Sequence, residues 1–373
     1  MKRKITYILF GIDKAPAFEW IIDKINTQKF QLEFILISSK KNTHIEAHCK
    51  SNNIPFYPIG YISKKDMPQS TWQVYKILRK TKPDAVHAHI FEAGLIGITA
   101  AFLARIPKRI YTRHYSTYHH QFHPNGVKYD KIINRLSTHI IAICNNVKEV
   151  LIQKENVPEN KIHLIRHGFN LEEFYTVSDE RIYALKTKYN PQNHYPVIGM
   201  MSRYIYLKGI QYTIPAFKNI LKKYPNALLI LANANGDYKN EIKKQLEELP
   251  ATAYTEIGFE NDNSALFKLF DVFVHVPIDK NIEAFGQIYV EALAAGTPSV
   301  FTPSGVAPEF VENGKNAVLV DFKNAKQIEE GILSILENKD FRNTLIENSK
   351  MYLDNFFSLH LMIDKLEQLY ERE

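Results

Sequence analysis

Two glutamates frame a short apolar segment in the second half of the chain. Glu283 and Glu291 lie eight positions apart, and the apolar segment ends at Gly296 and Pro298. Residues 287–295 are expected to form a helix, because Gly296 suits the left-handed position after a helix and Pro298 prevents its continuation. A helix turns by about 100° per residue, so eight residues place Glu291 roughly 80° around the helix axis from the direction of position 283. Both carboxylates can therefore line one pocket.

The start of this expected helix has the features of a site for a phosphorylated sugar. Gly286 permits close approach of the backbone, and the first N–H groups of a helix, with the positive end of its dipole, can receive a phosphate. Glu283 in the loop and Glu291 on the helix can accept hydrogen bonds from sugar hydroxyls. These features together suit a sugar nucleotide, whereas the spacing alone fits a surface helix with solvated acids equally well.

Two cations follow the expected strand 197–201 and could share that ligand. Arg203 offers a planar fork of donors and Lys208 a point charge, a pair suited to a diphosphate. If they offset the charge of a leaving diphosphate, the reaction needs no divalent ion for that purpose. The sequence also lacks an Asp-x-Asp pair placed after a strand, a common metal-chelating element of sugar-nucleotide sites. We therefore expect neither a metal nor another cofactor.

Histidines form a third candidate group, in the first half of the chain. His87 and His89 are expected on one side of a strand, because side chains alternate along a strand with a period of two. Two such imidazoles could bind zinc or iron, which makes a His-x-His metal-dependent hydrolase an alternative function. The other interpretation is that they are hydrogen-bonded structural residues. His114, at the end of the next expected strand, could contact a donor sugar or an acceptor.

Length and cysteine content limit the class of protein. The 373 residues exceed the size at which one hydrophobic core usually keeps growing, so two domains are expected. Cys49 and Cys144 have no metal-ligand spacing, which favours a reducing compartment and a structural role. No apolar run reaches the roughly eighteen residues that a membrane-spanning helix needs. We expect the run 5–12 to contain a buried first strand instead of a signal peptide.

The charge balance bears on partners. The 47 basic and 40 acidic residues give a net charge of +7, which favours polyanionic partners or an anionic membrane surface. Nucleic acid is not expected, because the basic residues are scattered and no zinc-finger or ribonucleoprotein motif is present. We expect a cytoplasmic protein that can contact the inner face of the plasma membrane peripherally.

Strand-like and helix-like segments alternate along the chain, a pattern typical of parallel sheets with helical crossovers. The expected strands are 5–10, 32–37, 85–89, 109–112, 140–144, 162–165, 197–201, 227–231, 272–276, 299–301 and 317–320. The expected helices are 17–26, 71–79, 93–104, 147–154, 211–223, 241–248, 287–295 and three stretches after residue 324. The polar segment 175–195 is interpreted as a linker. The prediction is an α/β protein with two Rossmann-like parallel-sheet domains that face each other across a cleft.

The domains are expected at residues 1–180, on the acceptor side, and 192–355, which would bind the nucleotide sugar. A C-terminal helix at 358–373 is expected to pack back on the first domain.

With these residues placed, the chain resembles the retaining glycosyltransferases of family four, which have the GT-B fold and use nucleotide-activated sugars. Glu283 and Glu291 match the family's pair of glutamates, and Arg203 and Lys208 with Gly209 match its diphosphate-binding turn. The resemblance covers nearly the full length. Other similar segments, in the same order, are 83–89, 142–148, 164–174, 284–286 and 292–298.

The resemblance implies a role for each candidate residue. Arg203 and Lys208 would hold the diphosphate, and Glu291 the ribose hydroxyls. Glu283 would hold the transferred sugar, and His114 would face that sugar from the first domain. Further donor-binding residues implied by the resemblance are Gly11, near the phosphate, Gly258 and Phe259, beside the base, and Ala284, Phe285, Gly286 and Gln287, at the start of the helix.

The chain departs from the family pattern at three places, which could alter the choice of donor. Gly11 is followed by Ile-Asp-Lys instead of a second glycine. Residues 233–236 read Asn-Ala-Asn-Gly where Gly-Asp-Gly is typical, and residues 304–309 contain one more residue than the common Gly-Gly-x-Pro-Glu.

The resemblance implies transfer of a hexose or N-acetylhexosamine from a nucleoside-diphosphate sugar to an acceptor hydroxyl, with retention at the anomeric carbon. A UDP-sugar is favoured, with GDP-mannose as the other donor considered. The expected acceptor is a glycan, lipid-linked or free, in surface polysaccharide or lipopolysaccharide biosynthesis. A sugar-nucleotide epimerase of similar architecture is a further alternative. The base, sugar, acceptor and linkage depend on the shape of the pocket and stay open.

Overall fold

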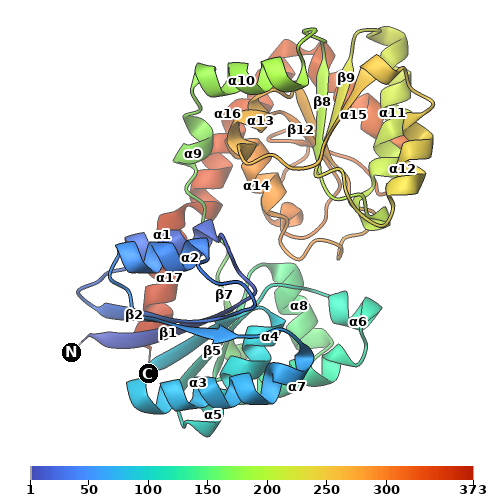
Figure 1. The fold of residues 1–373 in the computed structure, drawn as a ribbon. Helices are drawn as coiled ribbons and strands as arrows, with labels where there is room; N and C mark the ends of the chain where they lie inside the picture. Colours follow the sequence, from blue (N-terminus) through green and yellow to red (C-terminus); the bar gives the residue numbers. More distant parts are fainter. Residues whose placement is uncertain (1, 373) are drawn as a thin grey trace. The chain divides into compact units, whose positions relative to one another are not determined.

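The computed structural model describes residues 2–372, which form two compact units (Figure 1). Unit 1 contains the chain up to Phe169 and from Leu359 onward, and unit 2 contains Asn170–Ser358. Each unit has one sheet, and every strand pair in both sheets is parallel. The predicted class, an α/β protein with two parallel-sheet domains, is confirmed.

Unit 1 has a seven-stranded sheet in the order β3-β2-β1-β4-β5-β6-β7. Its strands are β1 (Arg3–Phe10), β2 (Phe30–Ser38), β3 (Phe56–Gly60), β4 (Ala85–His89), β5 (Lys108–Arg113), β6 (His139–Ala142) and β7 (Ile162–Leu164). Its helices are α1 (Pro16–Lys24), α2 (His44–Ser51), α3 (Met67–Thr81), α4 (Phe91–Ala93), α5 (Thr99–Leu103), α6 (Tyr118–Phe122), α7 (Gly126–Leu136), α8 (Asn145–Gln153) and α17 (Leu359–Glu371). Because the strands are parallel, their carboxyl ends share one edge of the sheet.

The last helix, α17, is part of the core of unit 1 and packs against α1. Its apolar residues, including Ile363 and Leu366, are buried with Tyr7 of β1 in one cluster. The hydroxyl of Tyr370 is hydrogen-bonded to the hydroxyl of Tyr7 and lies 2.8 Å from Nδ1 of His87. Polar and apolar contacts therefore fix the end of the chain to the first strands of unit 1.

The helical segment expected at 93–104 contains a turn of π-helix, Gly94–Ile98, between α4 and α5. Its glycines allow close packing on the sheet. A Cβ on Gly94 would lie 2.6 Å from the Tyr111 ring, and a Cβ on Gly97 would lie 2.7 Å from Ile8. Larger residues at these positions would push the segment away from β1 and β5.

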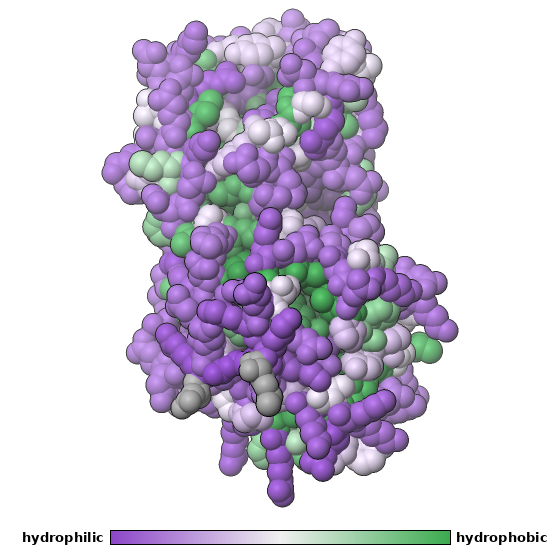
Figure 2. Space-filling view, turned by 90° about the vertical axis from the view of Figure 1, so that its left-hand side faces the viewer, coloured by the Kyte–Doolittle hydropathy of each residue, from purple (hydrophilic) through white to green (hydrophobic). Residues whose placement is uncertain are grey.

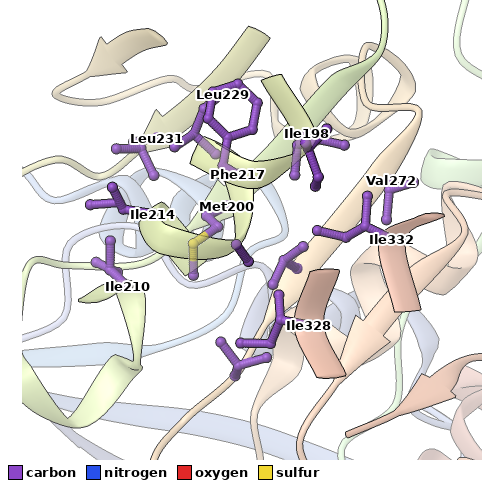
Figure 3. Packing of buried hydrophobic residues seen from close by; sticks show 14 of the residues in the cluster. Ile198, Met200, Ile210, Ile214, Phe217, Leu229, Leu231, Val272, Ile328 and Ile332 are labelled. Atoms are coloured by element: carbon purple, nitrogen blue, oxygen red, sulfur yellow. The ribbon is translucent and has the colours of Figure 1, made fainter. Parts of the chain in front are cut away.

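Unit 2 has a six-stranded sheet in the order β10-β9-β8-β11-β12-β13. Its strands are β8 (Val197–Met201), β9 (Leu228–Ala232), β10 (Tyr254–Ile257), β11 (Val272–His275), β12 (Ser299–Phe301) and β13 (Val318–Leu319). Its helices are α9 (Glu172–Tyr175), α10 (Asp179–Tyr189), α11 (Ile210–Lys223), α12 (Lys239–Leu246), α13 (Asn263–Lys268), α14 (Gln287–Ala294), α15 (Ala325–Glu337) and α16 (Lys339–Phe357). Figure 3 shows part of the core, where Phe217 and Ile214 of α11, Ile328 and Ile332 of α15, and sheet residues such as Leu229 are buried in one cluster.

The interpretation of residues 175–195 as a linker is wrong for most of that segment, because α10 is an ordered helix of unit 2. Ser178 caps it by accepting a hydrogen bond from the Arg181 N–H, and the helix packs against α13. Arg181 also makes a two-point ion pair with Asp262, with distances of 2.8 and 2.6 Å. Only Leu185 of α10 is buried, so the apolar pattern of the segment is weak.

The surface is largely hydrophilic on the face shown in Figure 2, where hydrophobic residues are visible in patches between hydrophilic ones. Within residues 2–372 there is no helix with the length and apolar character needed to cross a membrane.

Candidate functional site

The loops that follow β8, β11 and β12 meet at the carboxyl edge of the unit 2 sheet. Lys208 follows β8 and Glu283 follows β11. Lys208 Nζ lies 2.6 Å from Glu283 Oε1. The hydroxyl of Ser304, after β12, accepts a hydrogen bond from the Glu283 N–H at 3.2 Å and donates one to the Asp279 carbonyl at 2.8 Å. Two residues predicted from sequence, Lys208 and Glu283, are thus in direct contact.

A histidine completes the surroundings of the Glu283 carboxylate. Nε2 of His275, at the end of β11, lies 3.0 Å from Glu283 Oε1, and its side chain is 1% exposed. Burial lowers the pKa of His275, so the imidazole is neutral and its Nε2–H donates to the carboxylate. Burial alone would raise the pKa of Glu283, but the bond from His275 and the charge of Lys208 outweigh it and lower the pKa to about 2. Glu283 is therefore a carboxylate at neutral pH.

Two glycines with positive φ let the loops approach each other. Gly209 has a φ of 77°, and a Cβ there would lie 1.9 Å from the Val276 carbonyl oxygen. Gly305 has a φ of 61°, and a Cβ there would lie 2.6 Å from both Glu283 Cβ and the Phe285 carbonyl oxygen. Residues with side chains at these positions would displace Lys208 and Glu283 from each other.

Helix α14 begins beside Glu283, as the sequence predicts. Its N-cap, Gly286, has a φ of 85°, and Gly296 after its end has a φ of 68°. A Cβ on Gly286 would lie 2.7 Å from the Tyr289 ring, so the chain turns closely over that side chain. Phe285 is buried, which leaves the backbone, and not the phenyl ring, for a ligand. The first N–H groups of α14 and its positive dipole end lie at this turn, together with the exposed Gln287.

Glu291 is on α14, where it is half-buried. Burial raises the pKa of its carboxyl to about 7, so at neutral pH the group is close to its midpoint of ionisation. A carboxyl that lacks the solvation it would have in water gains more from hydroxyl donors than an exposed one would.

We expect Glu291→Gln to stabilise the ligand-free protein. Because folding raises the pKa of Glu291 to about 7, the folded state holds the proton more tightly than the unfolded state. The associated stability is present below the ordinary pKa of glutamate and is lost as the pH rises to about 7. At pH 8 the amide should therefore increase the free energy of unfolding by about 1–3 kcal/mol, with a smaller gain at pH 5.

Urea denaturation at both pH values measures this effect. Glu347→Gln, at an exposed position of α16, is the matched control and should show no difference between the two pH values. An equal gain at pH 5 and pH 8 for Glu291→Gln would contradict the raised pKa.

Arg203 lies on the same turn as Lys208, with its side chain exposed. The next residue, Tyr204, is buried and its hydroxyl donates to Glu256 of β10 at 2.9 Å. This bond places the end of β10 beside the turn. Gly258 and Phe259 follow that strand, and Phe259 is 72% exposed. The candidate residues for the diphosphate and for the base thus occupy adjacent loops of unit 2.

The remaining candidates, His114 and Gly11, lie in unit 1 at the carboxyl ends of β5 and β1. Nε2 of His114 lies 3.1 Å from Nδ1 of His89, and its ring is stacked on that of His167 with centroids 5.4 Å apart. Burial, together with the neighbouring histidines, holds the pKa of His114 well below its usual value. The imidazole is therefore neutral. Gly11 is exposed, has a φ of 65° and has open space where a Cβ would be.

His87 of β4 does not fit a metal site. Nδ1 of His87 lies 2.8 Å from the Tyr370 hydroxyl, and its Nε2 lies 2.7 Å from the Thr112 hydroxyl. Both nitrogens are therefore occupied, and burial lowers the pKa of His87 to about 3. Residues 2–372 contain no group of three or more His, Cys, Asp or Glu side chains placed to hold a metal ion. The structural interpretation of His87 fits these contacts better than the hydrolase alternative does.

His275 is the residue of the site that sequence reasoning missed. It occurs as one polar residue in the expected strand 272–276, where nothing distinguishes it from a structural histidine. A usable signal was its place at the carboxyl end of a central strand, eight positions before Glu283, because such ends carry ligand-facing residues in parallel sheets.

Comparison with known proteins identifies the family. Residues 31–173 match the family model described as Glycosyltransferase Family 4, and residues 183–352 match the one described as Glycosyl transferases group 1. The chain belongs to glycosyltransferase family four. The resemblance seen in the sequence is therefore confirmed, and the protein is a glycosyltransferase.

Curated relatives and solved structures agree with this family. The chain is 29% identical over 296 residues to the alpha-monoglucosyldiacylglycerol synthase of Acholeplasma laidlawii, covering 74% of this chain and 72% of that protein. It is 28% identical over 319 residues to the capsular polysaccharide biosynthesis glycosyltransferase CapM of Staphylococcus aureus, covering 81% and 80%. The structure of Anabaena HepE in complex with UDP-glucose has a TM-score of 0.82 at 20% identity, covering 99% of this chain and 100% of that one. The family four glycosyltransferase thus has the GT-B fold.

Proposed function

We propose that this family four enzyme transfers a hexose or N-acetylhexosamine from a nucleoside-diphosphate sugar to an acceptor hydroxyl, with retention at the anomeric carbon. The observation that carries the proposal is the cluster of Lys208, Glu283 and His275 beside the first turn of α14. Fixed positive charge and backbone N–H groups lie there next to an ionised carboxylate. Such a site can bind a diphosphate and a sugar hydroxyl at the same time.

The contact between Lys208 and Glu283 leaves capacity for a phosphate. An ammonium group has three donors, and the 2.6 Å contact with Glu283 uses one of them. The others can bind diphosphate oxygens, and Arg203 on the same exposed turn adds a guanidinium. These cations would stabilise the negative charge that develops as the glycosidic bond breaks, without a metal ion.

The carboxylates have separate tasks in this proposal. Glu283, held by His275 and Lys208, accepts a hydrogen bond from a hydroxyl of the transferred sugar. Glu291, with its raised pKa, accepts the ribose hydroxyls, and Gly258 and Phe259 border the base. In unit 1, His114 and Gly11 keep the roles that the resemblance implies, a neutral imidazole for a sugar and backbone for a phosphate.

In the proposed step, the acceptor oxygen forms a bond to the anomeric carbon on the face from which the diphosphate leaves. The bond from that carbon to the diphosphate oxygen breaks, and the acceptor proton moves to this oxygen. No side chain becomes covalently attached. A glycosyl-enzyme trapped during a single turnover would contradict this mechanism.

A UDP-sugar is the favoured donor, and GDP-mannose is the second choice. HepE has the same fold, and its complex with UDP-glucose supports UDP as the nucleotide.

For the acceptor we propose a lipid or lipid-linked glycan in surface polysaccharide or glycolipid synthesis. CapM and the alpha-monoglucosyldiacylglycerol synthase support this class. The enzyme would then work in the cytoplasm, peripherally at the membrane that carries its acceptor.

A panel of UDP-, GDP- and ADP-sugars tests the donor. The temperature of thermal unfolding should rise with the sugars of one nucleotide only. A ligand present at a hundred times its Kd adds about 2.7 kcal/mol of stability. No shift with any of these nucleotides would contradict the proposed function.

Incubation of the matching donor without acceptor separates transfer from epimerisation. An epimerase would change the donor sugar completely under these conditions, whereas we expect the sugar to be unchanged apart from slow hydrolysis.

Transfer to an acceptor in the presence of a chelator should continue at the full rate. Loss of transfer in the chelator would contradict metal independence.

A further inference from the structure

Two histidines at the carboxyl edge of the unit 1 sheet are joined by a hydrogen bond. His89 ends β4, and His114 follows β5, the neighbouring strand of the sheet. Nδ1 of His89 lies 3.1 Å from Nε2 of His114. The His114 ring is therefore held at one nitrogen by His89, in addition to its stacking on His167.

The surroundings of His89 are apolar and do not call for a histidine. Its side chain is buried, its ring is stacked on that of Tyr7 with centroids 5.6 Å apart, and the Phe18 ring meets it edge-on at 4.7 Å. Nε2 of His89 is buried and has no hydrogen-bond partner within residues 2–372. A leucine of similar volume would avoid the cost of that nitrogen, so packing alone does not explain a histidine here.

The backbone directly after His89 is strained. Ile90 has a φ of 62° and a ψ of 172°, a region that is populated almost only by glycine and is unfavourable for a β-branched residue. Its carbonyl accepts a hydrogen bond from the Gly94 N–H at 3.0 Å, so the chain turns at once from β4 into the next helical segment. Strained residues of this kind cluster at active sites and binding sites, which points to a functional role for this turn.

The protons of the two rings are coupled through their hydrogen bond. Burial in the first place, and the neighbouring histidines in addition, hold the pKa of both His89 and His114 well below the usual value. Each ring is therefore neutral and carries one N–H. Only one proton can lie between the two bonded nitrogens. If His89 donates it, Nδ1 of His114 carries the other proton; if His114 donates it, Nδ1 of His114 is a bare acceptor.

In either case both rings have the same tautomer. The bond occupies Nε2 of His114, so Nδ1 is the nitrogen that remains for a ligand. Which nitrogen of an imidazole carries the proton is set by the hydrogen bond that the other nitrogen makes. The partner of Nε2 thus determines whether Nδ1 donates or accepts.

We propose that His89 is a positioning residue for His114. Its hydrogen bond fixes the orientation and the tautomer of the His114 ring, so that Nδ1 meets the sugar with one defined hydrogen-bonding role. This inference rests on the proposed function, which places the neutral imidazole of His114 at a sugar. A ring that is fixed before the substrate arrives does not have to be ordered during the reaction.

Two replacements of His89 separate positioning from packing. Leucine suits the apolar surroundings and removes the unpartnered nitrogen, so His89→Leu should unfold at the temperature of the parent or above it. It also removes the hydrogen bond to His114, and kcat for transfer should fall by about tenfold. Asparagine keeps an amide at the δ position that can donate to Nε2 of His114 or accept from it, so His89→Asn should stay within about threefold of the parent. A purely structural histidine predicts the opposite order of activity, with the leucine variant at least as active as the asparagine variant, and that order would overturn the proposal.

Nitrogen NMR of the protein with isotope-labelled histidine measures the coupling directly. The signals are assigned by their loss in His89→Leu and His114→Leu. In the parent, the ring-nitrogen shifts of His89 and His114 should each show a single tautomer, and the same one in both rings. In His89→Leu the His114 shifts should move toward the average of the two tautomers. Different tautomers in the parent, or His114 shifts that the leucine leaves unchanged, would contradict the coupling.

His163→Leu is the matched control. His163 is a half-buried histidine of β7 whose Nε2 also has no hydrogen-bond partner among the described residues, and its ring is stacked on that of His139. This variant should leave kcat and the His114 ring shifts unchanged. An equal loss of kcat in the control would show that the effect is not specific to His89, and the proposal would fall.

Nucleotide-dependent thermal stabilisation separates this proposal from the proposed function. It should be equal in the parent and in His89→Leu, because the Lys208 and Glu283 cluster belongs to unit 2. If no nucleotide stabilises the parent, the proposed function fails, while the ring-nitrogen shifts still report on the histidine pair. Transfer at the parent rate by His114→Leu would remove His114 from the reaction, and with it the role of His89.

Discussion

Lys208→Ala is expected to reduce kcat/KM by about 30-fold to 5,000-fold, which corresponds to a loss of about 2–5 kcal/mol of transition-state stabilisation. Two effects combine in this variant. The leaving diphosphate loses a cation at the point where charge develops, and Glu283 loses the partner that lies 2.6 Å away. Without Lys208, a largely buried carboxylate would lose the cation whose charge helps to keep its pKa low.

Steady-state kinetics with the donor identified by the nucleotide panel measure this loss. Lys218→Ala is the matched control, because Lys218 makes a similarly short ion pair of 2.7 Å with Glu248 at an exposed position. The control should stay within about threefold of the parent. A Lys208 variant within the same threefold would contradict the assignment of this lysine to the diphosphate.

Arg113→Met is expected to lower the free energy of unfolding by about 3–5 kcal/mol, the usual cost of breaking a buried ion pair by removing one partner. The Arg113 guanidinium lies 2.7 Å from Glu155 and 3.2 Å from Asp130, and all three side chains are fully buried. Methionine would fill much of the volume but leave two carboxylates without their arginine. The neutral donors that remain, the Tyr115 hydroxyl on Asp130 and the Asn134 amide on Glu155, do not replace the lost positive charge.

Chemical denaturation followed by circular dichroism measures the effect. Arg181→Met removes a two-point pair with Asp262 that is partly exposed, so it should cost less than about 1 kcal/mol. Equal stability changes for the Arg113 and Arg181 variants would show that burial of the network contributes nothing beyond a surface pair.

The central strands of both sheets could be predicted from the sequence, because a strand buried on both faces is a continuous apolar run. Ala85–His89, Val197–Met201 and Ser299–Phe301 have the bounds expected for them. The edge strands β3 and β10 were missed. Pro58 interrupts the first of these, and the second contains only one buried residue, so neither has the apolar run of a central strand.

Helix α7 was missed for a different reason. Amphipathic patterns identify a helix when its apolar residues face the core, but α7 buries Asp130 and Asn134 and exposes Tyr129 and Ile132. The partners of the buried polar residues, Arg113 among them, are distant in sequence. The apolar residues Tyr129, Ile132, Ile133 and Leu136 do recur at helical spacing, so a helix could have been predicted here, but a single sequence does not show that Asp130 and Asn134 lie on its buried side.

The candidate site in unit 2 could be proposed from the sequence as a list of residues but not as a set of contacts. Glycines and a proline define the ends of α14, and family resemblance indicated Lys208 and Glu283 separately. Their direct pairing depends on the close approach of loops at Gly209 and Gly305, which only the tertiary structure shows. The contribution of His275 was hidden for the same reason.

A crystal structure of the protein with UDP-glucose, or with the donor that the nucleotide panel selects, tests the central claim most directly. We expect the diphosphate within hydrogen-bonding distance of Lys208 and Arg203 and of the first N–H groups of α14, and the ribose hydroxyls on Glu291. A nucleotide bound elsewhere, with no contact to Lys208, to Arg203 or to the first turn of α14, would contradict the account.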